Sequence, residues 1–238
     1  MSSHNDELLD EYDYFDDPLL AELLHSRDRQ SYKAMYHYGA GKNAFGRQLT
    51  AHQTRVAREG AALLRFIGYS DKAAANYRAA MQFHDIGKIN AIYDPLIWSQ
   101  EDRPSKEDKV LQKKHAPLGA QMWDEWCTQH AAALKDHPHY HIRKAVTSLH
   151  HERIDGKGPL GLNAAQMPIF VQISCIVDAY DGDRIKRPHQ PKRRSPREAL
   201  RRMSALDDPQ FKYKDAFNTD LLQKYIKMKE QQLDIQVL

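Results

Sequence analysis

The arrangement of apolar residues along this chain restricts it to a helical fold. Apolar side chains recur every three or four residues through much of its 238 residues, while alternating runs rich in β-branched residues are scarce. Residues 48–68, for example, place Leu49, Val56 and Leu63 along one side of a helix. The pattern predicts an all-α protein.

Local signals indicate where several of these helices begin. Ser105 with Asp108 three residues later matches a capping box, and Ser195 is followed by a proline and then by Glu198 in the same way. Further helices are expected over about residues 71–84, 110–122 with a restart at Pro117, 142–149, and 168–180. The intervening HPHYH stretch, residues 137–141, is expected to be a surface loop.

Length and charge favour one main domain preceded by an acidic segment. A chain of this size can bury a single core, so we expect an acidic, partly helical segment over residues 1–45 and one domain over 46–238. Residues 6–22 hold eight acids and no Lys or Arg, whereas residues 184–202 hold nine Lys or Arg and one acid. Solvated surfaces, a site for a phosphate-bearing ligand or a protein partner, and an acidic tail covering the basic patch all remain open.

Hydropathy and cysteine usage predict a cytoplasmic protein. Mean hydropathy is −0.75, and no apolar run approaches the roughly 20 residues that a membrane span requires. The acidic start also lacks the basic and apolar regions of a secretory signal. Cys127 and Cys175 have no CxxC partner and are expected to be buried, reduced thiols. Neither a membrane nor DNA is an expected partner.

Histidines and aspartates on or beside the apolar stripes predict a metal site. A single histidine there is usually an ordinary core residue, but unpaired burial of several polar side chains would cost a few kcal/mol each. A metal would satisfy them together, and the two oxygens of the Asp85 carboxylate can bridge two first-row divalent ions. The candidate ligands are His52, His84, Asp85, His115, His150, His151 and Asp178.

The same residues carry a resemblance to a known family. Their series is similar to the ligand series of the HD-domain metal-dependent phosphohydrolases, and more narrowly to the HD-GYP subfamily of bacterial cyclic di-GMP phosphodiesterases. HDIGK stands at 84–88, and HHERIDGKG at 150–158 matches the subfamily's HHExxDGxG. The resemblance covers about residues 45–225 and includes DPLIWSQEDRPSKED (94–108), KKHAPLGAQM (113–122), MPIFVQISCIVDAYD (167–181), Arg187-Pro188 and SPREAL (195–200).

The resemblance implies a helical bundle around a binuclear centre. Two divalent metals, iron or manganese before nickel, cobalt or magnesium, would share Asp85 and activate a water that attacks the phosphodiester. Lys88 would neutralise a phosphate oxygen, and Lys157 and Arg187 would bind the second phosphate. We expect Glu152 to orient an imidazole. Asp155 is expected to hold the glycine turn, and Asp181 a helix end.

Two departures from the subfamily bear on function. The Gly-Tyr-Pro triplet is here Gly158-Pro159, followed by a shortened loop in the region where the family contacts cyclic di-GMP or partner proteins. Gln48 replaces a glutamate that supports a third metal in some members, so two metals are expected. Three functions remain: hydrolysis of cyclic di-GMP to the linear dinucleotide and on to GMP, hydrolysis of another nucleotide or cyclic dinucleotide, and a weakly active or inactive module that binds cyclic di-GMP or a protein through the acidic segment.

Overall fold

The predicted all-α fold is confirmed by the computed structural model, which describes residues 7–39, 45–98, 105–185, 193–205 and 215–237. Over these ranges there is no β-strand, only an isolated bridge between Asp155 and Asn163. The elements are α2 (Pro18–Leu23), α3 (His25–His37), α4 (Phe45–Phe66), α5 (Asp71–Met81), η1 (Ile86–Ile89), η2 (Pro95–Trp98), α6 (Lys106–Lys113), α7 (His115–His130), η3 (Ala132–Asp136), α8 (Pro138–Leu149), η4 (Ala164–Gln166), α9 (Ile169–Arg184), α10 (Pro196–Met203) and α11 (Thr219–Leu233).

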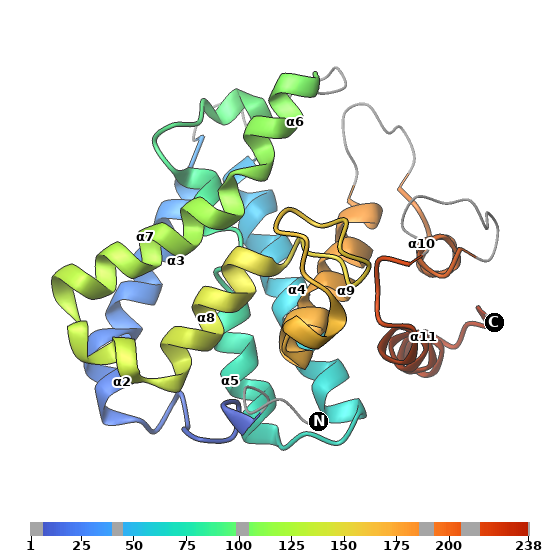
Figure 1. Cartoon of the computed structure of the whole chain (residues 1–238), viewed down its shortest axis with the longest axis horizontal. Coiled ribbons are helices and arrows are strands. Elements are labelled where there is room, and N and C mark those ends of the chain that lie inside the picture. Colours follow the sequence, from blue (N-terminus) through green and yellow to red (C-terminus); the bar gives the residue numbers. More distant parts are fainter. Residues whose placement is uncertain (1–6, 40–44, 99–104, 186–192, 206–214, 238) are drawn as a thin grey trace.

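Helix α4 is the central element of the bundle. It packs against α3, α5, α9 and α11, while α7 packs against α8 and η1 (Figure 1). The close pairing of α4 with α5 depends on Gly60, where a Cβ would overlap the ring of Tyr77. Helix α6 projects at the top of the view, and the first described residues lie at the opposite end (Figure 1).

The helix starts expected from capping signals are confirmed. Ser105 and Ser195 each form a complete capping box, with Asp108 and Glu198 as the reciprocal partners. The expected restart occurs slightly earlier than Pro117, because α6 ends at Lys113 and α7 begins at His115. Proline is tolerated there since the first turn of a helix has no partner for its backbone N–H groups.

The prediction of a surface loop at residues 137–141 is wrong. His137 caps α8, its ring accepting a hydrogen bond from the His139 amide, and Pro138 occupies the first helical position. The rings of His139 and Tyr140 are buried. The polar residues at 137–141 therefore cap and begin a helix. Polarity alone does not distinguish such a helix start from a loop.

The acidic segment contributes to the main core. Its apolar side chains Leu9, Tyr12, Leu20 and Leu24 are buried in the same cluster as the helices that follow. The Asn76 side chain on α5 holds the backbone of the acidic segment in place. It donates hydrogen bonds to the carbonyls of Leu9 and Tyr12 and accepts one from the Tyr14 amide. The acidic segment therefore packs against α5 as part of the main core and is not a solvated tail over these residues.

The state of the cysteines and the character of the helices can also be compared with the predictions. Cys127 and Cys175 are buried and free, as predicted. None of the helices in the described ranges combines the length and the apolar character needed to cross a membrane.

Candidate metal centre

The structure brings all seven candidate ligands together from five parts of the chain. His52 lies on α4, His115 opens α7, and Asp178 lies on α9. His84 and Asp85 occupy the turn between α5 and η1, and His150 and His151 follow the end of α8. Helix ends suit this role because adjacent side chains there can turn toward one point, which they cannot do within a helix.

The ligand atoms form two groups. One contains His115, His150 and His151, and the other His52, His84 and Asp85; within each group the ligand atoms lie within 4.8 Å of one another. All of these residues are buried except His151, whose side chain is 36% exposed. The partly exposed His151 ring leaves one side of the cluster open to solvent.

Asp85 connects the two groups. Its Oδ1 lies 3.0 Å from Nε2 of His115, while its Oδ2 lies 3.5 Å from Nε2 of His52. Each carboxylate oxygen therefore faces a different group. A carboxylate in this position can bind one metal through each oxygen, which is the bridging geometry of a binuclear site.

Asp178 joins the group around His52. Its Oδ1 lies 3.0 Å from Nε2 of His52 and 3.5 Å from Nε2 of His84. Its Oδ2 lies 3.8 Å from Nδ1 of His151, in the other group. Gln48 is exposed on α4.

Backbone carbonyls fix the tautomer of three of the imidazoles. Nδ1 of His84 lies 3.0 Å from the Met81 carbonyl, and Nδ1 of His150 lies 2.9 Å from the Thr147 carbonyl. His115 makes the same contact with Gln112. Because a carbonyl can only accept, Nδ1 carries the proton and Nε2 presents a lone pair to the centre.

Ring nitrogens that lie close to one another, together with buried unpaired ligand atoms, are the observation that fits a bound cation. Nε2 of His115 lies 3.3 Å from Nε2 of His150 and 3.2 Å from Nε2 of His151. His84 Nε2 and Asp85 Oδ1 are buried without a hydrogen-bond partner. Such groups cost free energy when left unpaired, and divalent metals satisfy imidazole nitrogens and carboxylate oxygens together.

The electrostatics around His84, His115, His151 and Asp85 favour metal ligation. Burial lowers the pKa of His84, His115 and His151, which keeps these imidazoles neutral. Burial would raise the pKa of Asp85, but the charge of Lys88 and the nearby histidines outweigh it and lower that pKa well below its ordinary value. Neutral imidazoles and ionised carboxylates are the forms that bind divalent ions.

Asp181 orients a candidate ligand, so its predicted role in holding only a helix end is wrong. Its Oδ2 accepts a hydrogen bond from Nδ1 of His52 at 2.7 Å, and Arg55 donates to both of its oxygens. Burial alone would raise the pKa of Asp181, but these hydrogen bonds lower it to about 2. The signal was present in the sequence, since Asp178 and Asp181 are three residues apart on one face of α9.

Replacing Asp181 with asparagine is expected to weaken metal binding by about 10- to 100-fold, because His52 loses the carboxylate that holds its tautomer. Competition with a chelator measures this affinity, and Asp183→Asn on the same helix is the matched control. Equal affinities in the two variants would contradict the role of Asp181. The depressed pKa also stabilises the fold above about pH 4, so the stability difference from wild type should shrink as the pH falls toward 2.

Close backbone contact brings His115 to the turn that contains His84 and Asp85. A Cβ on Gly87 would overlap the His115 carbonyl oxygen and would lie 2.6 Å from the Gly119 amide nitrogen. Gly119 is in turn the neighbour of Gly87 on α7, one helical turn after His115. The glycines of HDIGK and of the α7 sequence are therefore needed for this approach.

The glycine turn after His151 is held by Glu152, contrary to the prediction that Glu152 orients an imidazole. Its two oxygens accept hydrogen bonds from the amides of Leu160 and Leu162 at 2.6 and 3.3 Å. A Cβ on Gly158 would overlap Glu152 Oε2, so glycine is required at that position. The carboxylate is buried and satisfied by the loop that it closes.

The predicted role of Asp155 in the same turn agrees with its contacts. Arg153 donates two hydrogen bonds to its carboxylate, and the Lys157 amide donates a third. The Lys157 side chain is 73% exposed, and its Nζ lies 3.7 Å from Asp155 Oδ2. Arg187, the other predicted phosphate ligand, lies outside the described residues.

Lys88 lies against the centre. Its Nζ is 2.5 Å from Asp85 Oδ2 and its side chain is 19% exposed. The indole of Trp98 borders the same place: Lys88 Nζ lies 5.6 Å from its ring centroid, and the His115 ring meets it edge-on at 5.9 Å. Trp98 was not singled out from the sequence, because nothing in its local pattern distinguishes it from a core residue.

Comparison with known proteins points to one family, although the chain matches no protein-family model. A cyclic di-GMP phosphodiesterase of Pseudomonas aeruginosa is 32% identical over 153 residues, which cover 63% of this chain and 34% of that protein. A 3'3'-cGAMP-specific phosphodiesterase of Vibrio cholerae is 26% identical over 161 residues, covering 67% and 29%. A cyclic di-GMP phosphodiesterase of Thermotoga maritima is 24% identical over 186 residues, covering 77% and 45%.

The chain thus spans less than half the length of each of these relatives. Among solved structures, an HDG"Y"P protein from Bdellovibrio bacteriovorus is similar with a TM-score of 0.58 and 18% identity. The similarity covers 95% of this chain and 69% of that one. At this level of identity it establishes a shared fold.

Proposed function

We propose that this chain, which belongs to the HD-GYP subfamily of HD-domain phosphohydrolases, is a metal-dependent phosphodiesterase that opens cyclic di-GMP. The observation that carries the proposal is the bridging position of Asp85. Its two oxygens face two separate groups of buried ligand nitrogens. One carboxylate shared by two such groups is what a binuclear hydrolase requires.

In this proposal His52, His84 and Asp178 hold one divalent ion, His115, His150 and His151 hold the second, and Asp85 binds both. Bound metals supply a water of lowered pKa and positive charge beside the phosphate. Iron or manganese fits this mixture of imidazoles and carboxylates. Asp181 keeps His52 in the ligating tautomer, and backbone carbonyls do the same for His84, His115 and His150.

Lys88 is the proposed electrostatic residue. Its ammonium group is beside Asp85 and is partly exposed, so it can reach an anionic oxygen at the edge of the centre. As the phosphodiester is attacked, negative charge builds on the non-bridging oxygens, and a fixed cation there lowers the barrier. The centre is also open at His151, which directly precedes the glycine turn in the sequence.

Two substrate classes are supported by different observations. Two of the three relatives are named for cyclic di-GMP, which favours this dinucleotide and its linear product. The third is named for 3'3'-cGAMP, and the triplet tyrosine is absent here, which favours a second cyclic dinucleotide as the alternative. Both substrates present the same phosphodiester to the metals and differ in one base.

The deciding experiment measures metals and products together. The protein is purified anaerobically, its bound metals are quantified, and it is incubated with cyclic di-GMP, 3'3'-cGAMP and other nucleotides while products are separated by chromatography. About two metals per chain and a linear dinucleotide or GMP support the proposal. A metal-loaded protein that hydrolyses none of them would instead be a binding module, whose partner could contact the acidic segment.

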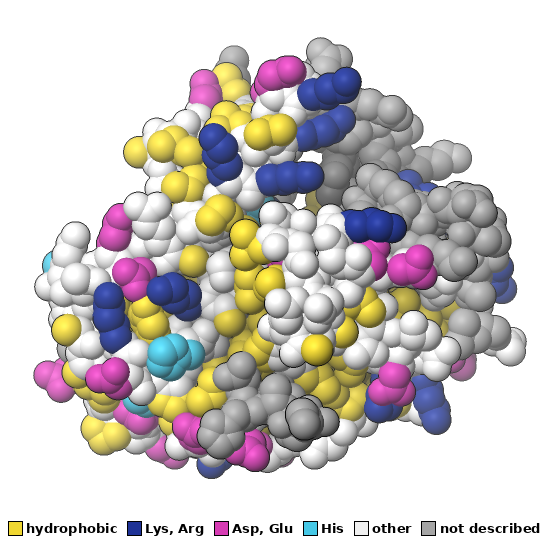
Figure 2. Space-filling model, in the orientation of Figure 1, with side chains coloured by type: hydrophobic (Ala, Val, Ile, Leu, Met, Phe, Trp, Pro, Cys, Tyr) yellow, Lys and Arg dark blue, Asp and Glu magenta, His cyan; other side chains and the backbone are white. Residues whose placement is uncertain are grey.

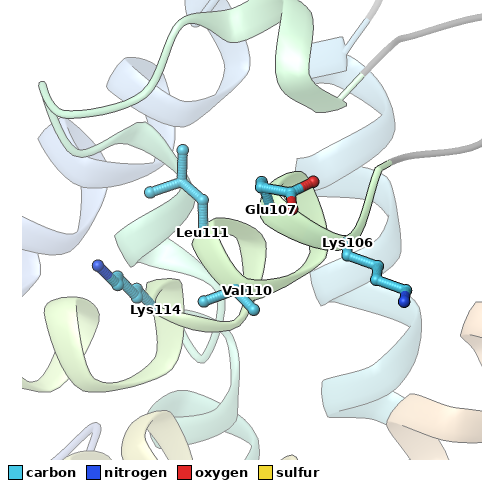
Figure 3. A pocket seen from close by; sticks show the side chains of 5 residues that line it. All are labelled: Lys106, Glu107, Val110, Leu111 and Lys114. Carbon is cyan, nitrogen blue, oxygen red and sulfur yellow. The ribbon is translucent and has the colours of Figure 1, made fainter.

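Exposed lysines on α6 are expected to accelerate the capture of an anionic substrate. Lys106, Lys109, Lys113 and Lys114 are all exposed, and α6 leads directly into His115. Figure 2 shows Lys and Arg side chains gathered over this helix. Figure 3 shows Lys106 and Lys114 on either side of Val110, along a shallow hollow. The four lysines outnumber the neighbouring Glu107 and Asp108, and an excess of positive charge beside a site attracts anionic ligands.

Reversing two of these charges tests the effect. Lys106→Glu/Lys109→Glu is expected to lower kcat/KM by about tenfold at low salt, with kcat unchanged, because only the encounter is affected. The difference should vanish near 0.5 M salt, roughly where charges on the surface are screened. Lys33→Glu/Lys72→Glu, on α3 and α5, changes the net charge equally and should have no such effect.

A further inference from the structure

A buried ion pair joins the acidic segment to α8. Arg143 is 3% exposed, and its Nη1 donates to Oδ1 of Asp28 on α3 at 2.7 Å. The other oxygen of Asp28 accepts a hydrogen bond from the Tyr14 hydroxyl at 2.5 Å. The carboxylate is therefore satisfied on both sides, and it is the partner that compensates the buried guanidinium.

The guanidinium of Arg143 also contacts two buried aromatic rings. Its central carbon lies 4.3 Å from the ring centroid of Phe83 and 4.3 Å from that of Trp123. Both rings are almost fully buried. A cation shielded from water in this way is attracted to aromatic faces more strongly than an exposed one, so the guanidinium constrains where the two rings lie.

Both ends of this contact lead directly to candidate metal ligands. Phe83 immediately precedes His84 and Asp85 in the turn after α5. Arg143 precedes His150 by two helical turns, so the two side chains project from the same face of α8. Phe83 further packs with Met35 of α3 in the smaller of the two apolar clusters.

We infer that Asp28 is a positioning residue for the metal centre, acting through Arg143 and Phe83. The carboxylate holds the guanidinium over the Phe83 ring, and the ring holds the turn that carries the bridging Asp85. The inference deepens the proposed function, because it rests on the same ligands being a metal centre. It also connects the acidic segment to that centre through Arg143 and Phe83.

A second ion pair, between the buried Lys229 and the partly exposed Glu59, provides a control. Lys229 on α11 is 4% exposed and donates to Glu59 on α4 at 2.9 Å. It contacts Tyr180 on α9 rather than the turn at residues 82–85. Glu59→Gln should therefore destabilise the fold much as Asp28→Asn does, without acting on the turn at residues 82–85.

Cobalt binding and amide exchange separate a positioning role from a purely structural one. The full chain is freed of metal, titrated with Co²⁺ under anaerobic conditions and followed by its visible absorption; hydrogen exchange is measured in parallel on peptides covering residues 81–90. Asp28→Asn is expected to bind Co²⁺ about tenfold more weakly, with altered absorption bands and faster exchange in those peptides. Glu59→Gln is expected to match wild type in all three.

Each outcome decides the inference. Wild-type cobalt affinity, bands and exchange in Asp28→Asn would overturn it while leaving the proposed function intact. A wild-type chain that binds no Co²⁺ overturns the proposed function and the inference together. Should Asp28→Asn fail to fold, Asp28→Asn/Arg143→Met removes the buried charge with its partner and is expected to fold. This double variant lacks the guanidinium over Phe83, so unchanged bands and exchange in it would overturn the inference.

Discussion

Replacing Asp85 with alanine is expected to abolish turnover, lowering kcat by at least about 10³-fold, because the substitution removes the carboxylate whose two oxygens lie 3.5 and 3.0 Å from ligand nitrogens of the two groups. Loss of a bridging carboxylate also leaves each metal one ligand short and allows the two ions to repel each other. We therefore expect less than two metals per chain. Product chromatography and metal analysis measure the two effects on the same sample.

The control for Asp85→Ala is another carboxylate that is removed without touching the centre. Asp124 on α7 pairs with Tyr140, Lys135 and Lys144 at the surface, and Asp124→Ala changes the net charge equally. Its turnover and metal content should equal those of wild type. If Asp85→Ala keeps two metals and wild-type turnover, Asp85 is not the bridge and the proposed mechanism is wrong.

Gly87→Ala is expected to be strongly disruptive, costing about 3 kcal/mol of unfolding free energy. The added carbon meets backbone atoms of α7, which cannot move unless the whole helix moves. The helix carries His115, so the group of three histidines should also lose its metal. Urea denaturation and metal analysis give the two readouts.

Gly119→Ala tests the same contact between η1 and α7 with a milder substitution. Its Cβ would lie 2.8 Å from Cγ2 of Thr147, a side-chain atom, and 3.1 Å from the Gly87 amide nitrogen. A side chain can shift where backbone cannot, so this variant should lose less stability than Gly87→Ala and keep more metal. The reverse order would contradict the view that close backbone approach, rather than helix propensity, explains the glycine in HDIGK.

Some features of the fold could be predicted from the sequence because they depend only on residues that are close together in the chain. The capping boxes at Ser105 and Ser195 involve atoms within three residues of each other, and both are present. The prediction of a loop at 137–141 failed because it, too, used only the local sequence. A helix that starts with polar capping residues and then buries His139 has the composition of a loop until its packing partners are known.

The roles of polar side chains near the centre were harder to predict. Glu152 was expected to orient an imidazole and instead holds the amides of the following loop, while Asp181 was expected to be structural and instead accepts from His52. Both are acids close to ligands in sequence. Which of them reaches a ring depends on where the backbone turns after each one, and this is not a local property.

By itself, the sequence determined that the chain is all-α and which histidines and aspartates are candidate ligands, because helical spacing and ligand chemistry belong to short stretches of chain. Only the tertiary structure decided how these residues are supported. Asp181 reaches His52 across 129 residues, and Asp28 reaches Arg143 across 115. Such pairs form where two helix faces meet, and the faces that meet are selected by the packing of the whole core rather than by either segment alone.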